Sequence, residues 1–155
     1  MRLILLRHAK SDRGDPAAED HDRPLAPRGR AAAPLVGAWL RERPPLPDRV
    51  LVSTARRAQE TWAALGLPGE AESRSDLYLA APEAILAAAP RDGCALLVGH
   101  NEGMRRAAEA FCAEPPDHPR FRRFPTGACL ILQFDGPPRW RGGRVEAFTV
   151  PRDLA

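Results

Sequence analysis

Arginine and histidine side chains occur directly after three apolar segments of the sequence, in positions where they could share one ligand. In chain order these residues are Arg7 with His8, then Arg56 with Arg57, then His100. Arginine is always charged, and its planar fork binds phosphate oxygens in pairs. A histidine with a free ring nitrogen can act as a nucleophile that briefly carries a transferred group. Together these residue types predict a site that binds a phosphoryl group and transfers it.

The elements that must position these side chains are three strands. Arg2–Leu6, Arg49–Ser53 and Cys94–Gly99 are short apolar runs, and the continuous hydrophobicity of Cys94–Gly99 is typical of a strand buried on both faces of a parallel sheet. Ligands of open α/β sheets bind beyond the carboxyl ends of the strands. We therefore expect the arginines and histidines to meet at one edge of a sheet.

Helical patterns alternate with these strands, which indicates an α/β fold. The predicted helices are Arg28–Arg43, Thr54–Leu65, Pro82–Ala89 and Glu102–Cys112. Two late apolar runs, Ala128–Phe134 and Arg144–Val150, predict strands that are antiparallel to each other because so few residues join them. Since no repeat or linker interrupts the pattern, we expect a single domain over residues 1–155.

Composition excludes several classes of protein. The chain has 155 residues, of which 44% are hydrophobic and 28% charged, and no apolar stretch approaches the length of a membrane span. The net charge is only +3, and the one basic cluster with interleaved aromatics is Arg120–Phe124, so a nucleic-acid partner is not predicted. The three cysteines form no pair motif, which favours buried free thiols and a cytoplasmic location.

Three ordered motifs resemble those of the histidine phosphatase superfamily, the phosphoglycerate mutase-like proteins. Leu5–Ser11 is similar to the RHG signature, Ser53–Thr61 to the Ser-x-x-x-Arg-Ala-x-x-Thr motif, and Val98–Asn101 to the segment around the second histidine. Asp22–Leu25 with Arg28-Gly29, and Phe124–Gly127, are similar to the phosphohistidine phosphatase branch. The resemblance extends from Met1 to about Phe134.

The resemblance implies a role for each residue that matches a motif. His8 would be the nucleophile that becomes phosphorylated, Arg7, Arg57 and His100 would bind phosphoryl oxygens, and Ser11 would add a hydroxyl donor. It also implies a three-layer α/β/α sandwich over a mostly parallel six-stranded sheet, with no metal and no organic cofactor. The expected partner is a phosphorylated protein or a small phosphorylated substrate.

Two positions depart from the family pattern. Ala9 replaces the glycine of the signature, which is tolerable if the backbone there keeps a negative φ. The glutamate that protonates the leaving oxygen in mutases and phosphomonoesterases has no counterpart in Leu77–Pro82. Expelling an alkoxide without a general acid is slow, whereas imidazole is a better leaving group. This departure favours phosphohistidine on another protein as the substrate, hydrolysed in two steps through His8.

Two other functions remain open. A broad phosphomonoesterase acting on sugar or nucleotide phosphates would need a proton donor from Asp76, Glu83 or the polar segment Lys10–Pro27. A non-catalytic module that binds phosphoproteins would keep the cationic site without turnover. The sequence indicates neither the partner protein nor the oligomeric state.

Overall fold

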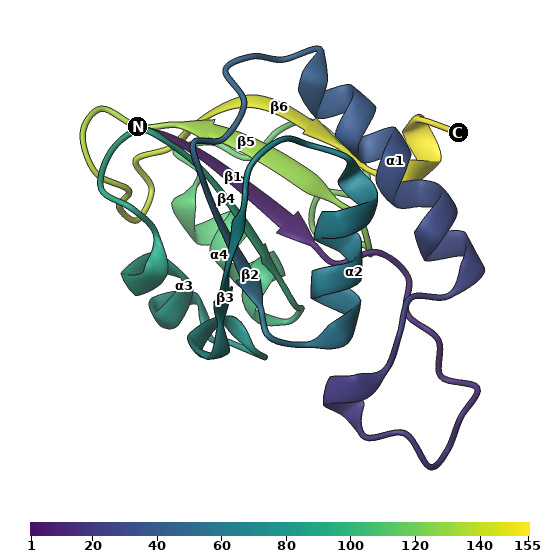
Figure 1. Cartoon of the computed structure of the whole chain (residues 1–155). Helices are drawn as coiled ribbons and strands as arrows, with labels where there is room; N and C mark the ends of the chain where they lie inside the picture. Colours follow the sequence, from purple (N-terminus) through teal and green to yellow (C-terminus); the bar gives the residue numbers. More distant parts are fainter.

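The computed structural model describes all 155 residues around one six-stranded sheet (Figure 1). The strands are β1 (Arg2–Arg7), β2 (Arg49–Ser53), β3 (Ala71–Arg74), β4 (Cys94–Gly99), β5 (Cys129–Gln133) and β6 (Arg144–Thr149). Their order across the sheet is β3-β2-β4-β1-β5-β6. Strands β1 to β4 are mutually parallel, and β5 is antiparallel to both β1 and β6. The predicted mostly parallel sheet is confirmed.

Helices cover both faces of the sheet and complete the predicted three-layer sandwich. They are α1 (Pro27–Arg41), α2 (Arg56–Leu65), α3 (Pro82–Ala88) and α4 (Gly103–Phe111), with short 3-10 turns η1 (Asp20–Asp22), η2 (Ser75–Leu77) and η3 (Pro151–Asp153). Figure 1 shows α1 and α2 packed together on one face, and α3 with α4 on the other. None of these helices has the length and apolar character that a bilayer crossing requires.

Strand β1 explains why the middle strands are apolar on both sides. Leu3 and Leu5 belong to the core beneath α3 and α4, where Phe111 also packs. Ile4 and Leu6 belong to the core on the opposite face, beneath α1 and α2. Because side chains alternate along a strand, a strand covered on both faces needs an unbroken apolar run.

Strand β3 was not predicted from the residues, although the six strands implied by the family resemblance include it. Its sequence is Ala-Glu-Ser-Arg, and it pairs only with β2 at the edge of the sheet, where two of its side chains are exposed. An edge strand exposed on both faces needs no apolar pattern. Its place is therefore decided by backbone pairing with β2.

Helix α2 begins two residues later than predicted, at Arg56. Ala55 has an extended backbone and caps the helix, and the Thr54 hydroxyl hydrogen-bonds to Nε2 of His21 at 2.8 Å. Thr54 therefore ties the β1–α1 loop to the end of β2. Helices α1, α3 and α4 end within one or two residues of the predicted bounds, as frayed helix ends commonly do.

The longest connection, residues 8–26 between β1 and α1, extends away from the carboxyl edge of the sheet (purple in Figure 1). An isolated bridge between Ser11 and Leu25 closes the loop at its base. The turn η1 lies within the loop and contacts α2. This loop brings Asp20 to the carboxyl edge of the sheet. Cys94, Cys112 and Cys129 are buried free thiols, as predicted.

Candidate active site

The structure brings all the predicted site residues to one cavity of 180 Å³ at the carboxyl edge of the sheet. Twelve residues line this histidine cavity: Arg7, His8, Lys10, Ser11, Arg13, Asp20, Arg23, Arg57, Leu79, His100, Asn101 and Thr126. The His8 and His100 rings lie close together, with centroids 5.1 Å apart. Only one lining residue, Leu79, is hydrophobic, and five carry a positive charge against a single carboxylate. The cavity is therefore suited to a compact anion.

His8 has one ring nitrogen available for chemistry. Its Nδ1 lies 2.7 Å from the Ala9 carbonyl oxygen, and because a carbonyl only accepts, Nδ1 carries the proton and donates. Nε2 consequently holds the lone pair. Burial, together with the nearby His100 and Arg57, lowers the pKa of His8 to about 3, so the ring is neutral at pH 7. A neutral imidazole with a fixed tautomer has the properties of a nucleophile.

The backbone around His8 is fixed on both sides. The His8 amide donates to the Gly99 carbonyl at 3.0 Å, which joins the ends of β1 and β4. The Ala9 amide donates to Thr61 Oγ1 at 3.0 Å. Ala9 does not adopt positive φ, and its methyl group is buried against Leu25. The backbone therefore accommodates alanine at the signature glycine, as predicted.

Arg57 is the most constrained cation of the cavity, with 2% of its surface exposed. Its Nη1 donates to the Asp20 carbonyl at 2.7 Å, and its Nη2 lies 3.1 Å from both Asp20 Oδ2 and His100 Nδ1. Its Nε is buried without a protein partner. Arg56, by contrast, points away and pairs with Glu60 at 3.0 Å. The cavity thus contains the arginine that the Arg-Ala-x-x-Thr register selects.

His100 is buried between Arg57 and Ser53. Since arginine only donates, Nδ1 of His100 accepts from Arg57, and Nε2 donates to Ser53 Oγ at 2.7 Å. Burial lowers the pKa of His100 to about 3, and the positive charge of Arg57 adds to this effect. To donate to a phosphoryl oxygen, Nδ1 must take up a proton. A dianion in the cavity would favour that uptake because an adjacent negative charge stabilises the imidazolium.

Arg7 is held in the histidine cavity by an unusual backbone feature. Its Nη1 donates to the Phe124 carbonyl at 3.2 Å, and Asn101 Nδ2 donates to the same oxygen at 3.0 Å. Phe124 is fully buried and has a φ of 43°, which is rare for a residue with a side chain. The packed Phe124 ring therefore holds its carbonyl where it orients Arg7 and Asn101.

Asp20 is the only carboxylate in the histidine cavity, and it comes from the polar segment that was considered as a source of a proton donor. Its Oδ2 accepts from the Tyr78 hydroxyl and from Arg57, and its Oδ1 accepts from Arg23 Nη2 at 3.0 Å. The hydrogen bond from Tyr78, reinforced by Arg57, holds the pKa of Asp20 well below its usual range. The carboxylate is therefore ionised in this setting.

The two other acids considered from the sequence lie outside the cavity. Asp76 accepts from Arg74 at 2.7 Å, and this hydrogen bond lowers the pKa of Asp76. Glu83 is exposed in the first turn of α3. Neither residue lines the cavity.

Several lining residues were not identified from the sequence. Arg23 donates from Nη1 to Ser11 Oγ at 3.0 Å, which leaves the Ser11 hydroxyl proton free to face a ligand. Arg23 lies in a segment that carries the family resemblance, so that resemblance was the one available signal. The same signal was available for Asn101, which lies in the Val98–Asn101 motif. Arg13 and Tyr78, which contacts Asp20, gave no signal, because the position of each depends on loop conformation. No group of three or more potential metal ligands converges in the chain.

Comparisons with known proteins agree with this geometry. The model of the histidine phosphatase superfamily (branch 1) matches residues 3–77. The uncharacterized protein Rv1276c of Mycobacterium tuberculosis is 48% identical over 144 residues, which is 84% of this chain and 88% of that protein.

Two solved structures of candidate phosphohistidine phosphatases named SixA are also similar. The Nakamurella multipartitia protein has a TM-score of 0.80 and 30% identity, covering 97% of this chain and 95% of that one. The Agrobacterium tumefaciens protein has a TM-score of 0.78 and 31% identity, covering 97% of each.

Proposed function

The chain belongs to the histidine phosphatase superfamily and is a phosphatase, and we propose that it hydrolyses phosphohistidine carried by other proteins. The observation that carries the proposal is the state of the two ionisable groups in the histidine cavity. His8 is a neutral imidazole with its Nε2 lone pair free, and the one carboxylate, Asp20, is ionised. The site thus contains a nucleophile and a set of cationic groups that bind an anion, but no protonated carboxyl group that could act as a general acid.

In the first step, His8 Nε2 attacks the phosphorus atom of the substrate phosphohistidine. A P–N bond forms to His8, the substrate P–N bond breaks, and its electron pair returns to the substrate imidazole. That imidazole leaves as a neutral group when its other nitrogen carries a proton, which it takes up near neutral pH. Arg7, Arg57 and a protonated His100 would stabilise the charge on the three transferring oxygens.

In the second step, water attacks the phosphorus atom of phosphorylated His8. The P–N bond breaks, His8 recovers its lone pair, and inorganic phosphate is released. The water must lose a proton, and ionised Asp20 is the only carboxylate that lines the cavity. We assign to Asp20 the role of receiving that proton. A phosphoryl oxygen bound to Arg57 would compete with Asp20 for the same guanidinium, which would raise the pKa of Asp20 toward its ordinary range.

The broad phosphomonoesterase is less well supported, because an alkoxide leaving group needs a proton that an ionised Asp20 does not hold. Losing general acid catalysis costs about 10²–10⁴-fold in rate. A module that only binds phosphoproteins is also less well supported, since binding alone would not require the unprotonated imidazole of His8 in the histidine cavity.

The test is a comparison of kcat/KM for N-phosphohistidine, a histidine-phosphorylated peptide and an alkyl phosphate ester under identical conditions. The proposal expects both phosphohistidine substrates to exceed the ester by at least about 10²-fold. Faster turnover of the ester would assign the chain to phosphomonoesterases. Trapping a labelled phosphoryl group on His8 that is then released as inorganic phosphate would exclude a pure binding module.

A further inference from the structure

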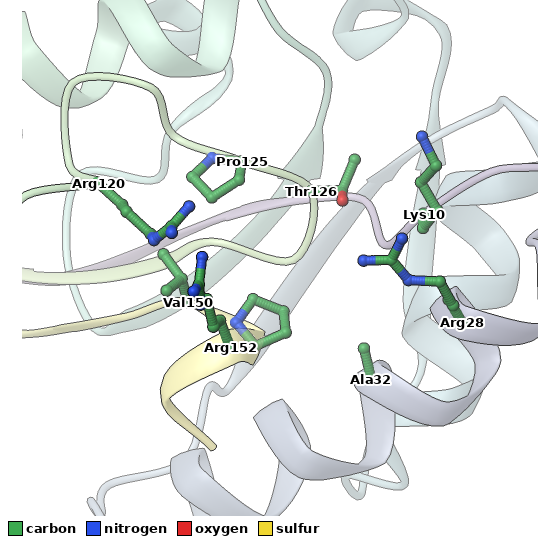
Figure 2. Close-up of a pocket in the computed structure, with 9 residues that line it drawn as sticks. Lys10, Arg28, Ala32, Arg120, Pro125, Thr126, Val150 and Arg152 are labelled. Atoms are coloured by element: carbon green, nitrogen blue, oxygen red, sulfur yellow. The ribbon is translucent and has the colours of Figure 1, made fainter. Parts of the chain in front are cut away.

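A second cavity, of 240 Å³, lies beside the histidine cavity, and four of the nine residues that line it are cations (Figure 2). Its charged residues are Lys10, Arg28, Arg120 and Arg152, and the rest of its lining is Ala32, Pro125, Thr126, Val150 and Pro151. Figure 2 shows Lys10 and Arg28 on one side and Arg120 with Arg152 on the other. We call this cavity the basic pocket.

The four cations of the basic pocket have no acidic partner. None of them forms an ion pair, and no carboxylate lines the pocket. Some arginines elsewhere on the surface do pair with nearby acids, as Arg105 does with Glu102. The nearest acid in sequence, Asp153, is already paired with His118 at 2.7 Å. Four converging like charges without a counter-charge create a positive potential that an anionic ligand would neutralise.

The basic pocket is assembled from four separate segments. Lys10 follows β1, Arg28 lies in the first turn of α1, Arg120 precedes β5, and Arg152 belongs to η3. A close backbone contact aligns the first two, because a Cβ atom at position 29 would lie only 2.1 Å from the Lys10 carbonyl oxygen. Only glycine at position 29 lets α1 approach Lys10 this closely. The first turn of α1 carries no acidic residue, so its positive end adds to the charge of the pocket.

The basic pocket adjoins both the histidine cavity and an open groove, since it shares lining residues with each. Lys10 and Thr126 line both cavities. Arg28 and Arg152 also line a groove of 530 Å³ along α1, where Leu35 is 38% exposed. A ligand that reached from His8 across the basic pocket into this groove would be longer than a small phosphate ester. An extended polypeptide has the required length and can supply both acidic and apolar side chains.

We propose that the basic pocket docks acidic side chains of the phosphorylated protein, next to the phosphohistidine that enters the histidine cavity. This inference rests on the proposed function and adds a substrate preference to it. Opposite charges at the two surfaces would speed association and select phosphohistidines with acidic neighbours. The reaction at His8 would be unchanged, because the four cations, apart from Lys10, do not line the histidine cavity.

The experiment compares two phosphohistidine peptides of equal length, one with three glutamates on each side of the phosphohistidine and one with three glutamines. Free N-phosphohistidine is the third substrate. The variant is R28E/R152E, which removes half of the cations of the basic pocket while leaving the histidine cavity intact. The matched control is R91E/R106E, which makes the same change of charge at exposed arginines that form no ion pair and line neither cavity.

The wild-type chain should prefer the glutamate peptide by about tenfold in kcat/KM at low salt, and the preference should shrink as salt is added. R28E/R152E should lose the preference, whereas R91E/R106E should keep it. Both variants should hydrolyse free N-phosphohistidine as the wild type does, which also shows that they fold.

Four results would overturn the inference. Equal turnover of the two peptides by the wild type would show that the pocket does not bind acidic residues next to the phosphohistidine. An equal loss for free N-phosphohistidine in R28E/R152E would place the effect in the chemistry of the histidine cavity. If the wild type hydrolysed none of the phosphohistidine substrates but cleaved an alkyl ester, the proposed function would fail and the docking inference with it. A loss in R28E/R152E confined to small substrates with a second phosphate would instead assign the pocket to such substrates.

Discussion

The histidine cavity and the basic pocket are both rich in cations, but they hold their cations in different ways. In the histidine cavity, Arg57 is buried and bonded to Asp20 and His100, and Arg7 is bonded to the Phe124 carbonyl. In the basic pocket, Arg28 and Arg152 are exposed and unpaired, as is Lys10, which lines both cavities. Fixed donors can stabilise a transition state without reorganising, whereas mobile surface charges act at longer range on association. The difference separates a place for chemistry from a place for recognition.

The largest expected effect comes from removing the nucleophile. His8→Ala should lower kcat by at least about 10⁴-fold for every phosphohistidine substrate, since no other lining group can form the covalent intermediate. Steady-state assays would measure kcat, and quenching the reaction with labelled substrate would show whether a phosphorylated intermediate still forms. His118→Ala, which alters a histidine outside both cavities, is the control. Residual turnover within tenfold of wild type would contradict the role assigned to His8.

A pair of arginine-to-lysine variants would sharpen the comparison between the two pockets. Arg57→Lys should lower kcat by about 10²-fold or more, because lysine cannot replace a buried fork that bonds to several partners at once. Arg28→Lys should change kcat/KM for the glutamate peptide by less than about twofold, because docking needs charge and not a fork. Similar losses in both variants would remove the distinction between the pockets.

The third prediction concerns the pH dependence of stability. Both His8 and His100 have pKa values of about 3 in the fold, well below the usual value near 6.5. The unfolded chain therefore binds more protons between about pH 6.5 and 3, and the free energy of unfolding should fall as the pH is lowered through this window. The slope can reach about 1.4 kcal/mol per pH unit for each histidine.

Denaturant unfolding at pH 7, 6, 5 and 4 would measure that slope. His100→Gln should reduce the slope, because this variant lacks one of the two histidines that take up a proton when the chain unfolds in this pH range. Arg28→Gln, in the basic pocket, should leave the slope unchanged because Arg28 does not line the cavity that holds the two histidines. A wild-type slope near zero would mean that the histidines are protonated in the fold.

Within the histidine cavity, the smallest expected effect is on product binding. Asp20→Asn should tighten inorganic phosphate binding by about three- to tenfold, because the carboxylate both repels the anion and occupies Arg57. Isothermal titration would measure the affinity. Asp76→Asn is the matched control, since Asp76 pairs with Arg74 outside the cavity. Weaker phosphate binding in Asp20→Asn would show that Asp20 mainly positions Arg57.

Local patterns of sequence were enough to predict the elements that carry the site. The apolar runs before His8 and His100 gave β1 and β4 because a central strand must be apolar on both faces. The choice of Arg57 over its neighbour Arg56 came from the family resemblance, through the register of the Arg-Ala-x-x-Thr motif. The helix explains why the two differ, because one residue rotates a side chain by about 100°. Strand β3 could not be found this way, since an exposed edge strand carries no periodic signal.

The irregular segments were not predictable from local patterns. Asp20 was one of several acids in a polar loop, and nothing in its neighbours distinguished it from Asp12 or Asp15. Its place depends on bonds to Arg57 and Tyr78, which are 37 and 58 residues away in sequence. Such long-range contacts exist only once the sheet and α2 are assembled.

By itself, the sequence determined which residue types follow the strands, and so the kind of anion that the chain can bind. A strand and its polar end are encoded within a few neighbouring residues, so they can be read locally. Only the tertiary structure decided which ring nitrogen of each histidine carries the proton and which carboxylate lines the histidine cavity. It also decided that four cations distant in sequence form a second pocket beside that cavity. Those properties depend on distances and burial between segments that are remote in sequence, because electrostatic interactions are set by spatial separation and solvent exclusion.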